Sequence, residues 1–170
     1  MADFLPAYQK TIVAEGGLKL TNISGDAGGQ TYAGISRHAN PQWEGWELVD
    51  KGITPPERLV QVFYKSFYWD CIMGDKLDNQ DTAENLFDFA VNGGVDTAKH
   101  LAQHAAKVTP DRIFGSKTII AINSMDQELF QLRFDIYKID RYRDIVTAKP
   151  VNAKFLLGWI NRTLNQEGIS

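Results

Sequence analysis

The sequence predicts a mainly α-helical protein with one small β-hairpin layer near residues 18–35. Helix start and stop signals recur along most of the chain, and apolar residues follow them at helical spacing. One glycine-rich stretch breaks this pattern with a short apolar alternation. The chain has 170 residues, of which 44% are hydrophobic and 11% aromatic, so it can bury a core without disulfide or metal staples.

The first segment is typical of a helix followed by a hairpin. Asp3 can cap the helix, and Pro6 falls in its first turn, where the missing N–H costs little. The pair Gly16-Gly17 ends this helix. Leu18 and Leu20 then alternate with polar residues ahead of several glycines, which predicts a hairpin and not another helix.

Two capping boxes predict the helices in the middle of the chain. Residues 54–57 (Thr-Pro-Pro-Glu) combine a cap, prolines and a glutamate, and the helix should run from there towards Gly74. Residues 81–84 (Asp-Thr-Ala-Glu) form the second start, with the aspartate as cap. The helix that follows is apolar around most of its circumference up to Gly93-Gly94, so we expect it to be central and buried.

The C-terminal half is predicted to be helical with one turn-rich connector. Residues 97–108 form a helix, and residues 109–116 connect it to a short one. The longest helix should start at Ser124 and end at Pro150, because proline cannot continue it. A last helix carries the apolar residues of the segment 155–160.

Charge and composition exclude several classes of protein. Eighteen basic and 21 acidic residues give a net charge of −3, which argues against a dedicated nucleic-acid binder. One cysteine, Cys71, cannot form an internal disulfide. No stretch approaches 18 apolar residues, and no signal peptide is visible at the start. We therefore expect synthesis in the cytoplasm and, if the protein acts outside, release by a holin, by lysis or by a secretion system.

Two carboxyl groups and a hydroxyl around the predicted hairpin are the strongest candidates for chemistry. Glu15 lies at a helix end, where the macrodipole is unfavourable for a negative charge, a useful property for a general acid. Asp26 follows in a glycine-rich polar loop where it can stay ionised, and Thr31 offers a hydroxyl that could orient water. Glycoside hydrolysis needs two carboxyls in such contrasting environments. Ordinary helix-end and turn chemistry would give the same short patterns.

The same segment resembles the catalytic motif of the glycoside hydrolase family 108 lysozymes, the N-acetylmuramidases of phages and bacteria. Later segments resemble the central helix of that family and its C-terminal module, so that nearly the whole chain is covered. The matching residues are Glu15-Gly16-Gly17, Asp26, Gly28-Gly29, Thr31, Gly34-Ile35-Ser36, Phe87–Gly94, Asp111–Thr118 and Phe155–Arg162.

This resemblance implies a lysozyme-like α (α+β) domain over residues 1–93 and a helical, predicted peptidoglycan-binding module over residues 94–170. It implies that Glu15 is the general acid and that Asp26 and Thr31 are the supporting catalytic residues. The expected reaction is hydrolysis of the β-1,4 bond between N-acetylmuramic acid and N-acetylglucosamine in peptidoglycan. The expected partner is the glycan strand, bound by a monomer that acts on the cell wall and needs no cofactor.

Five further residues are candidates for contact with the substrate. Gln30 and Tyr32 flank Thr31. Trp43 and Trp46 lie in a segment with glycine and proline, where an indole ring could stack on a sugar. Asn92 precedes a glycine pair. Core packing, capping and turn formation are equally open explanations for these side chains.

No metal site is expected. His100 and His104 have a helical spacing that can bind zinc, but Leu101 stands where zinc proteases carry a glutamate, so we expect a pair on the helix surface. The aspartates of the segment 75–81 lack the glycine of a calcium loop.

Two other functions stay open on the sequence. A lytic transglycosylase would use the same acid and form an anhydro-sugar without water. A non-catalytic peptidoglycan-binding or secretion-associated protein would keep the fold and lack activity.

Overall fold

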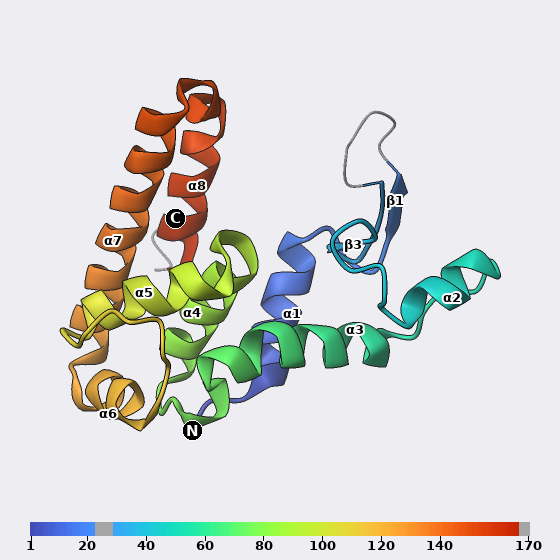
Figure 1. The fold of residues 1–170 in the computed structure, drawn as a ribbon. Helices are drawn as coiled ribbons and strands as arrows, with labels where there is room; N and C mark the ends of the chain where they lie inside the picture. The colour runs from blue at the N-terminus through green and yellow to red at the C-terminus, as the bar shows by residue number, and fades with distance from the viewer. Residues whose placement is uncertain (23–28, 167–170) are drawn as a thin grey trace.

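The computed structural model describes residues 1–22 and 29–166 and shows a mainly helical molecule with one small sheet (Figure 1). Predictions of a hairpin layer, a central helix and a helical C-terminal half are confirmed. The elements are α1 (Phe4–Ala14), β1 (Leu20–Asn22), β2 (Gln30–Tyr32), β3 (Ile35–Ser36), α2 (Gly45–Asp50), α3 (Glu57–Tyr64), α4 (Gln80–Gly93), α5 (Val95–Ala105), α6 (Ser116–Ser124), α7 (Gln127–Ala148) and α8 (Ala153–Gln166).

Helix α1 begins and ends as its residues predict. The carboxylate of Asp3 accepts a hydrogen bond from the backbone N–H of Leu5 at 3.2 Å. At the other end, Glu15 follows the last helical residue, and its N–H still donates to the carbonyl of Thr11 at 2.9 Å. Gly16 and Gly17 have φ values of +90° and +80°, a conformation that glycine adopts without steric cost. The chain therefore turns away directly after Glu15.

The sheet is a three-stranded antiparallel meander in the order β1-β2-β3. Thr31 is the central residue of β2 and pairs with Thr21 on one side and Ser36 on the other. Ala33 and Gly34 join β2 to β3 with φ values of +50° and +78°, and two successive positive φ angles fit the right-handed twist of a tight hairpin. This turn points back towards the end of α1.

The prolines delay the start of α3. We predicted that Thr54 caps this helix, whereas the structure begins it at Glu57 after an extended Pro56 with ψ of 144°. Pro56 disfavours the helical region for the residue before it, so the helix cannot start earlier. The helix also ends sooner than Gly74, because a π-helical turn (Lys65–Trp69) and two 3-10 turns replace its last part.

Two other predicted starts are wrong by two residues. Asn79, and not Asp81, caps α4 by accepting from the N–H of Thr82 at 2.8 Å. The backbone N–H of Asp3 donates to the side-chain oxygen of Gln80 at 2.7 Å, and the side-chain nitrogen of Gln80 donates to the backbone carbonyl of Asp3 at 3.0 Å. These two bonds hold Gln80 at the start of the helix. Similarly, α7 is capped by Asp126 and not by Ser124, which ends α6.

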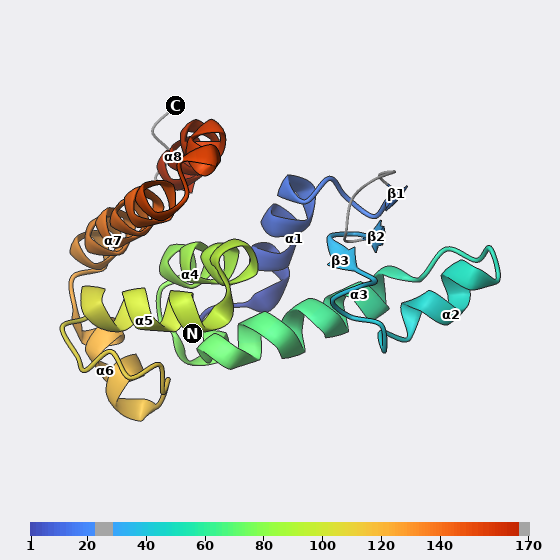
Figure 2. The same cartoon turned by 45° about the horizontal axis from the view of Figure 1, so that its top comes forward.

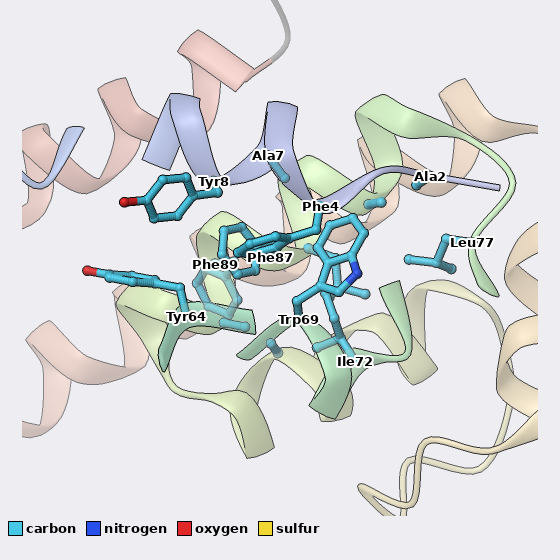
Figure 3. Packing of buried hydrophobic residues seen from close by; sticks show 14 of the residues in the cluster. Ala2, Phe4, Ala7, Tyr8, Tyr64, Trp69, Ile72, Leu77, Phe87 and Phe89 are labelled. Atoms are coloured by element: carbon cyan, nitrogen blue, oxygen red, sulfur yellow. The ribbon is translucent and has the colours of Figure 1, made fainter. Parts of the chain in front are cut away.

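Helix α4 is central, as its sequence predicts. Every residue from Thr82 to Ala90 is buried, so the helix is covered around its whole circumference. On one side it meets an aromatic cluster in which Phe87 and Phe4 pack edge-on against Trp69, which is fully buried (Figure 3). Edge-to-face packing of this kind stabilises a core beyond the burial of its area alone.

On its other side α4 meets the C-terminal helices through buried polar groups. The side chains of Lys138 and Asp135 in α7 are only 3% and 9% exposed and form an ion pair. Lys138 also donates to the side-chain oxygen of Asn85 at 2.7 Å, and Asn85 donates to Asp135 at 3.2 Å. Buried charges are tolerated only when they are paired and hydrogen-bonded, so this cluster fixes how α7 docks on α4.

Helices α7 and α8 run antiparallel, side by side, and α8 returns towards α4 and α1 (Figures 1 and 2). The 3-10 turn Pro150–Asn152 reverses the chain between them. Consequently the last helix of the chain approaches the end of the first one.

Replacing Lys138 by Met should destabilise the protein by about 3 kcal/mol, because Asp135 would keep a buried charge without a counter-charge. The measurement is chemical denaturation followed by circular dichroism. Adding Asp135→Asn to the same chain removes that charge and should recover part of the loss. Lys117→Met, on the exposed surface of α6, is the matched control, and equal destabilisation by both lysine variants would contradict this account.

Candidate active site

The side chain of Glu15 lies between the β2–β3 turn and the last helix. It is 24% exposed, so solvent still reaches it although most of it is covered. Its Oε1 atom is 3.4 Å from an Nη2 atom of Arg162 in α8. These two residues are separated by 147 positions in the sequence.

A glycine makes room for this carboxyl. A Cβ atom built on Gly34 would lie 3.3 Å from Oε2 of Glu15 and 2.4 Å from the hydroxyl oxygen of Tyr64. That hydroxyl donates to the carbonyl of Ala33 at 2.9 Å and so ties the turn to α3. Burial, and then the negative charge of Glu15, raise the pKa of Tyr64, so the phenol stays protonated and keeps its role as donor.

Arg162 is held in place by a second carboxylate, that of Asp88 in α4. Its Nη2 and Nε atoms donate to the two oxygens of Asp88 at 2.6 and 3.0 Å, a bidentate arrangement. Asp88 is only 10% exposed and needs this partner. Burial lowers the pKa of Arg162, but hydrogen bonding and charge from Asp88 and Glu15 outweigh it, and the net shift is upwards. One guanidinium thus links α8, α4 and α1.

No sequence pattern predicted a role for Arg162, Asp88 or Tyr64. Arg162 and Asp88 both fall within segments that resemble family motifs, and a charge inside an otherwise apolar helix such as α4 was the available signal. Their contact with Glu15 depends on the return of α8, which no local pattern reveals.

Of the two predicted supporting residues, the structure describes only Thr31. Asp26 lies outside the described residues. Thr31 is half-buried in β2, three positions before Gly34 and therefore in the same hairpin that lies against Glu15. Because side chains alternate along a strand, Thr31 faces the side of the sheet opposite to Gln30 and Tyr32.

Gln30 and Tyr32 are engaged within the protein. The side-chain oxygen of Gln30 accepts from Arg37 at 2.7 Å, and the hydroxyl of the buried Tyr32 donates to the carbonyl of Pro55 at 3.1 Å. The bond of Tyr32 links the hairpin to the segment before α3, and the bond of Gln30 links β2 to the residue after β3.

The two predicted cleft tryptophans pack beside Tyr32. Trp43 is half-buried and stacks on Tyr32 with ring centroids 5.8 Å apart. Trp46 is buried, meets Trp43 edge-on, and donates its indole N–H to the carbonyl of Asn40 at 2.8 Å. Trp43 also lines a cavity of about 380 Å³ together with Phe63 of α3 and Phe67 of the π-helical turn. Neither Tyr64 nor Glu15 lines this cavity.

Asn92 is the last of the candidate substrate contacts and lies near Arg162. It is exposed near the end of α4, and its side-chain nitrogen donates to the carbonyl of Asp88 at 2.7 Å. Together with Arg162 it lines a cavity of about 440 Å³ between α4 and the α7–α8 pair. Of the five candidate substrate contacts, Asn92 is thus the one that shares a cavity with the residue touching Glu15.

Nothing in the described part of the chain groups three or more histidine, cysteine, aspartate or glutamate side chains as a metal site would require. The rings of His100 and His104 lie 4.7 Å apart, and Nδ1 of His100 is 3.1 Å from the carbonyl of Pro110. Over the same residues, no helix combines the length and the hydropathy needed to cross a membrane.

Comparison with solved structures shows the fold. The structure of SagA from Brucella abortus superposes with a TM-score of 0.73, at 20% sequence identity, over 97% of this chain and 91% of that chain. The predicted fold class, a mainly α, lysozyme-like protein with a small β layer and a helical C-terminal part, is confirmed. No curated protein matches the sequence significantly.

Comparison with family models is more specific. Residues 97–164 match a model described as a predicted peptidoglycan domain, which supports peptidoglycan as the partner of this chain. Residues 8–94, about half of the chain, match the model described as glycosyl hydrolase 108, and this segment includes Glu15, Gly34 and Asp88. The chain therefore belongs to the glycosyl hydrolase 108 family and is a glycoside hydrolase.

Proposed function

We propose that this protein hydrolyses the β-1,4 bond between N-acetylmuramic acid and N-acetylglucosamine in peptidoglycan, with Glu15 as the general acid. The observation that carries the proposal is the setting of the Glu15 carboxyl. It is mostly covered, it lies against a glycine turn that leaves room for it, and it faces a guanidinium fixed by a second carboxylate. Family membership supplies the reaction class.

The chemistry follows from a proton donor beside a glycosidic oxygen. Glu15 protonates the bridging oxygen, the bond between that oxygen and the anomeric carbon breaks, and positive charge develops on the sugar ring. Water then adds to the anomeric carbon and returns a proton. In this proposal Asp26 stabilises the developing charge or activates the water, and Thr31 positions it.

Arg162 acts as a positioning residue. Its bidentate contact with Asp88 fixes the guanidinium, and the longer contact of 3.4 Å orients the carboxyl of Glu15. When Glu15 has given up its proton, the same guanidinium stabilises the carboxylate that remains. Preorganised charges of this kind act at low cost, because they need not reorient during the reaction.

Glu15→Gln should leave folding intact and lower the rate of peptidoglycan solubilisation by at least about 100-fold, since an amide cannot donate the proton. The measurement is the release of soluble fragments from purified cell walls, with circular dichroism to confirm the fold. A fully active Glu15→Gln protein would refute the assignment.

Fragments released by the unmodified protein should each carry one added water, measured by mass spectrometry. Anhydro-sugar products would instead identify a lytic transglycosylase. Binding to cell walls without any fragment release would identify a non-catalytic peptidoglycan-binding protein.

Gly34→Ala should abolish most of the activity, because its Cβ atom would displace the Tyr64 hydroxyl and crowd Glu15. Gly52→Ala is the matched control: its φ is +71°, close to the +78° of Gly34, but no atom lies within 4 Å of the added methyl group. Both variants should lose about 1–2 kcal/mol of stability from the left-handed backbone, and Gly34→Ala should lose more, because the Tyr64 hydroxyl is displaced from the carbonyl of Ala33. Thermal unfolding and fragment release separate the two effects, and equal activity of the two variants would contradict the close approach.

Arg162→Lys should lower kcat by up to about 100-fold and change KM less, because one ammonium group cannot hold Asp88 with two bonds and Glu15 with a third. Arg143→Lys on the exposed face of α7, where the arginine pairs with Asp140 and Asp144, is the control. Steady-state kinetics on soluble glycan chains gives both constants. A rise in KM alone would mean that Arg162 only binds the substrate.

A further inference from the structure

The largest of the cavities beside Arg162 opens between the end of α4, the start of α5 and the α7–α8 pair. Its volume is about 440 Å³, which is within the usual range of small-molecule sites. The part of its wall that the structure describes contains no acidic side chain. It is formed by Phe89, Asn92, Gly93, Thr97, Arg141, Tyr142, Ile145, Gly158, Trp159 and Arg162.

A glycine in the interior of α8 keeps this space open. Gly158 lies near the middle of the helix, where glycine is less favourable than any residue except proline. A Cβ atom added to it would meet nothing within 4 Å, so no neighbour among the described residues requires a glycine there. Gly158 lines this cavity and also a second one of about 300 Å³ between α1, α4 and α8. Its missing side chain therefore leaves room that the folded chain itself does not use.

Part of the wall is aromatic. Trp159 is half-buried, and its ring lies 5.3 Å from that of Tyr142 at an interplanar angle of 30°. Its indole N–H makes no hydrogen bond with residues 1–22 or 29–166. A partly exposed indole of this kind presents an apolar face together with a polar edge.

Hydrogen-bond donors surround this aromatic wall. Arg141 is exposed at the rim and forms no ion pair within the described residues, and Asn92 contributes its amide. A ligand with apolar ring faces and many oxygen acceptors matches these groups, whereas a cation would find no carboxylate in this wall.

The cavity lies beside the arginine that contacts the candidate acid. Arg162 lines both cavities and touches Glu15, and Ala14, the residue before Glu15, lines the second cavity. A chain-like ligand held over Gly158 would thus extend towards the reacting bond.

We propose that the space over Gly158 is a binding subsite for an N-acetylated sugar unit of the glycan strand, with Trp159 as its stacking surface. This inference rests on the proposed function, because it assumes that the same strand reaches Glu15. It places the recognition of glycan at the junction of the two matched regions, and it assigns Gly158 the task of leaving the subsite open.

The test places the same leucine side chain at two positions on the same helix. Gly158→Leu fills the subsite, and Ala153→Leu places that side chain at an exposed position that lines neither cavity. Both are made in the full chain with Glu15→Gln, which separates binding from turnover. The probe is chitohexaose, a sugar chain without peptide, and its Kd is measured by titration calorimetry.

We expect Gly158→Leu to raise the Kd at least tenfold without lowering the melting temperature, because the helix gains a better former and the unliganded chain has room for it. Gly158→Ala should give a smaller increase and Ala153→Leu none. Trp159→Phe should also weaken binding while keeping an aromatic ring against Tyr142.

Three outcomes would overturn the subsite: unchanged binding by Gly158→Leu, no binding of chitohexaose to the parent chain, or binding that requires peptide-bearing fragments. If binding responds as expected but Glu15→Gln still releases fragments from cell walls, the subsite stands and the proposed general acid is wrong. The failures of the two proposals are therefore distinguishable.

Discussion

Pairing of the Arg162 guanidinium with two carboxylates from distant helices determines the geometry of the candidate site. A charged group that is largely removed from water must find counter-charges, and Asp88 supplies both of its oxygens for this purpose. The contact with Glu15 is longer and involves one nitrogen only. In the proposed reaction this asymmetry suits Arg162, because Asp88 holds the guanidinium in place while Glu15 transfers its proton. The last helix is therefore part of the site, and not only a neighbour of it.

Helix α4 connects these contacts to the rest of the molecule. Asn85, Asp88 and Asn92 follow one another along one stripe of the helix, each meeting a different feature: the buried pair in α7, Arg162 in α8, and the cavity over Gly158. The opposite side carries Phe87 into the aromatic core with Trp69. Since both sides are fully packed, a shift of α4 would disturb the core and the site together. The central position of α4 explains why a helix with so many apolar residues also carries buried polar ones.

Local chemistry made part of this arrangement predictable from the sequence. The helix ended by Gly16-Gly17, the hairpin after it and the burial of α4 all depend on residues close together in the chain. The failures have a common cause in contacts over long sequence distances. Asn79 replaces Asp81 as the cap because Asp3, 77 positions before Gln80, fixes the first residue of the helix. Arg162 could be noticed in a motif, but its pairing with Glu15 could not be predicted. The contact requires the chain to fold back over 147 positions.

Gly158 is unusual because it is a glycine inside a helix that no contact in the described residues requires. Glycine inside a helix lowers stability. Gly34, in the β2–β3 turn, is required by its neighbours, because Tyr64 and Glu15 occupy the space where its Cβ atom would be. Gly158 has no such neighbour, yet it borders two cavities that flank the arginine of the site. A stability loss without a packing reason is typical of positions where function requires an open space. The two glycines therefore have opposite physical explanations: Gly34 is required by neighbours in the folded protein, whereas Gly158, in our proposal, leaves room for a ligand.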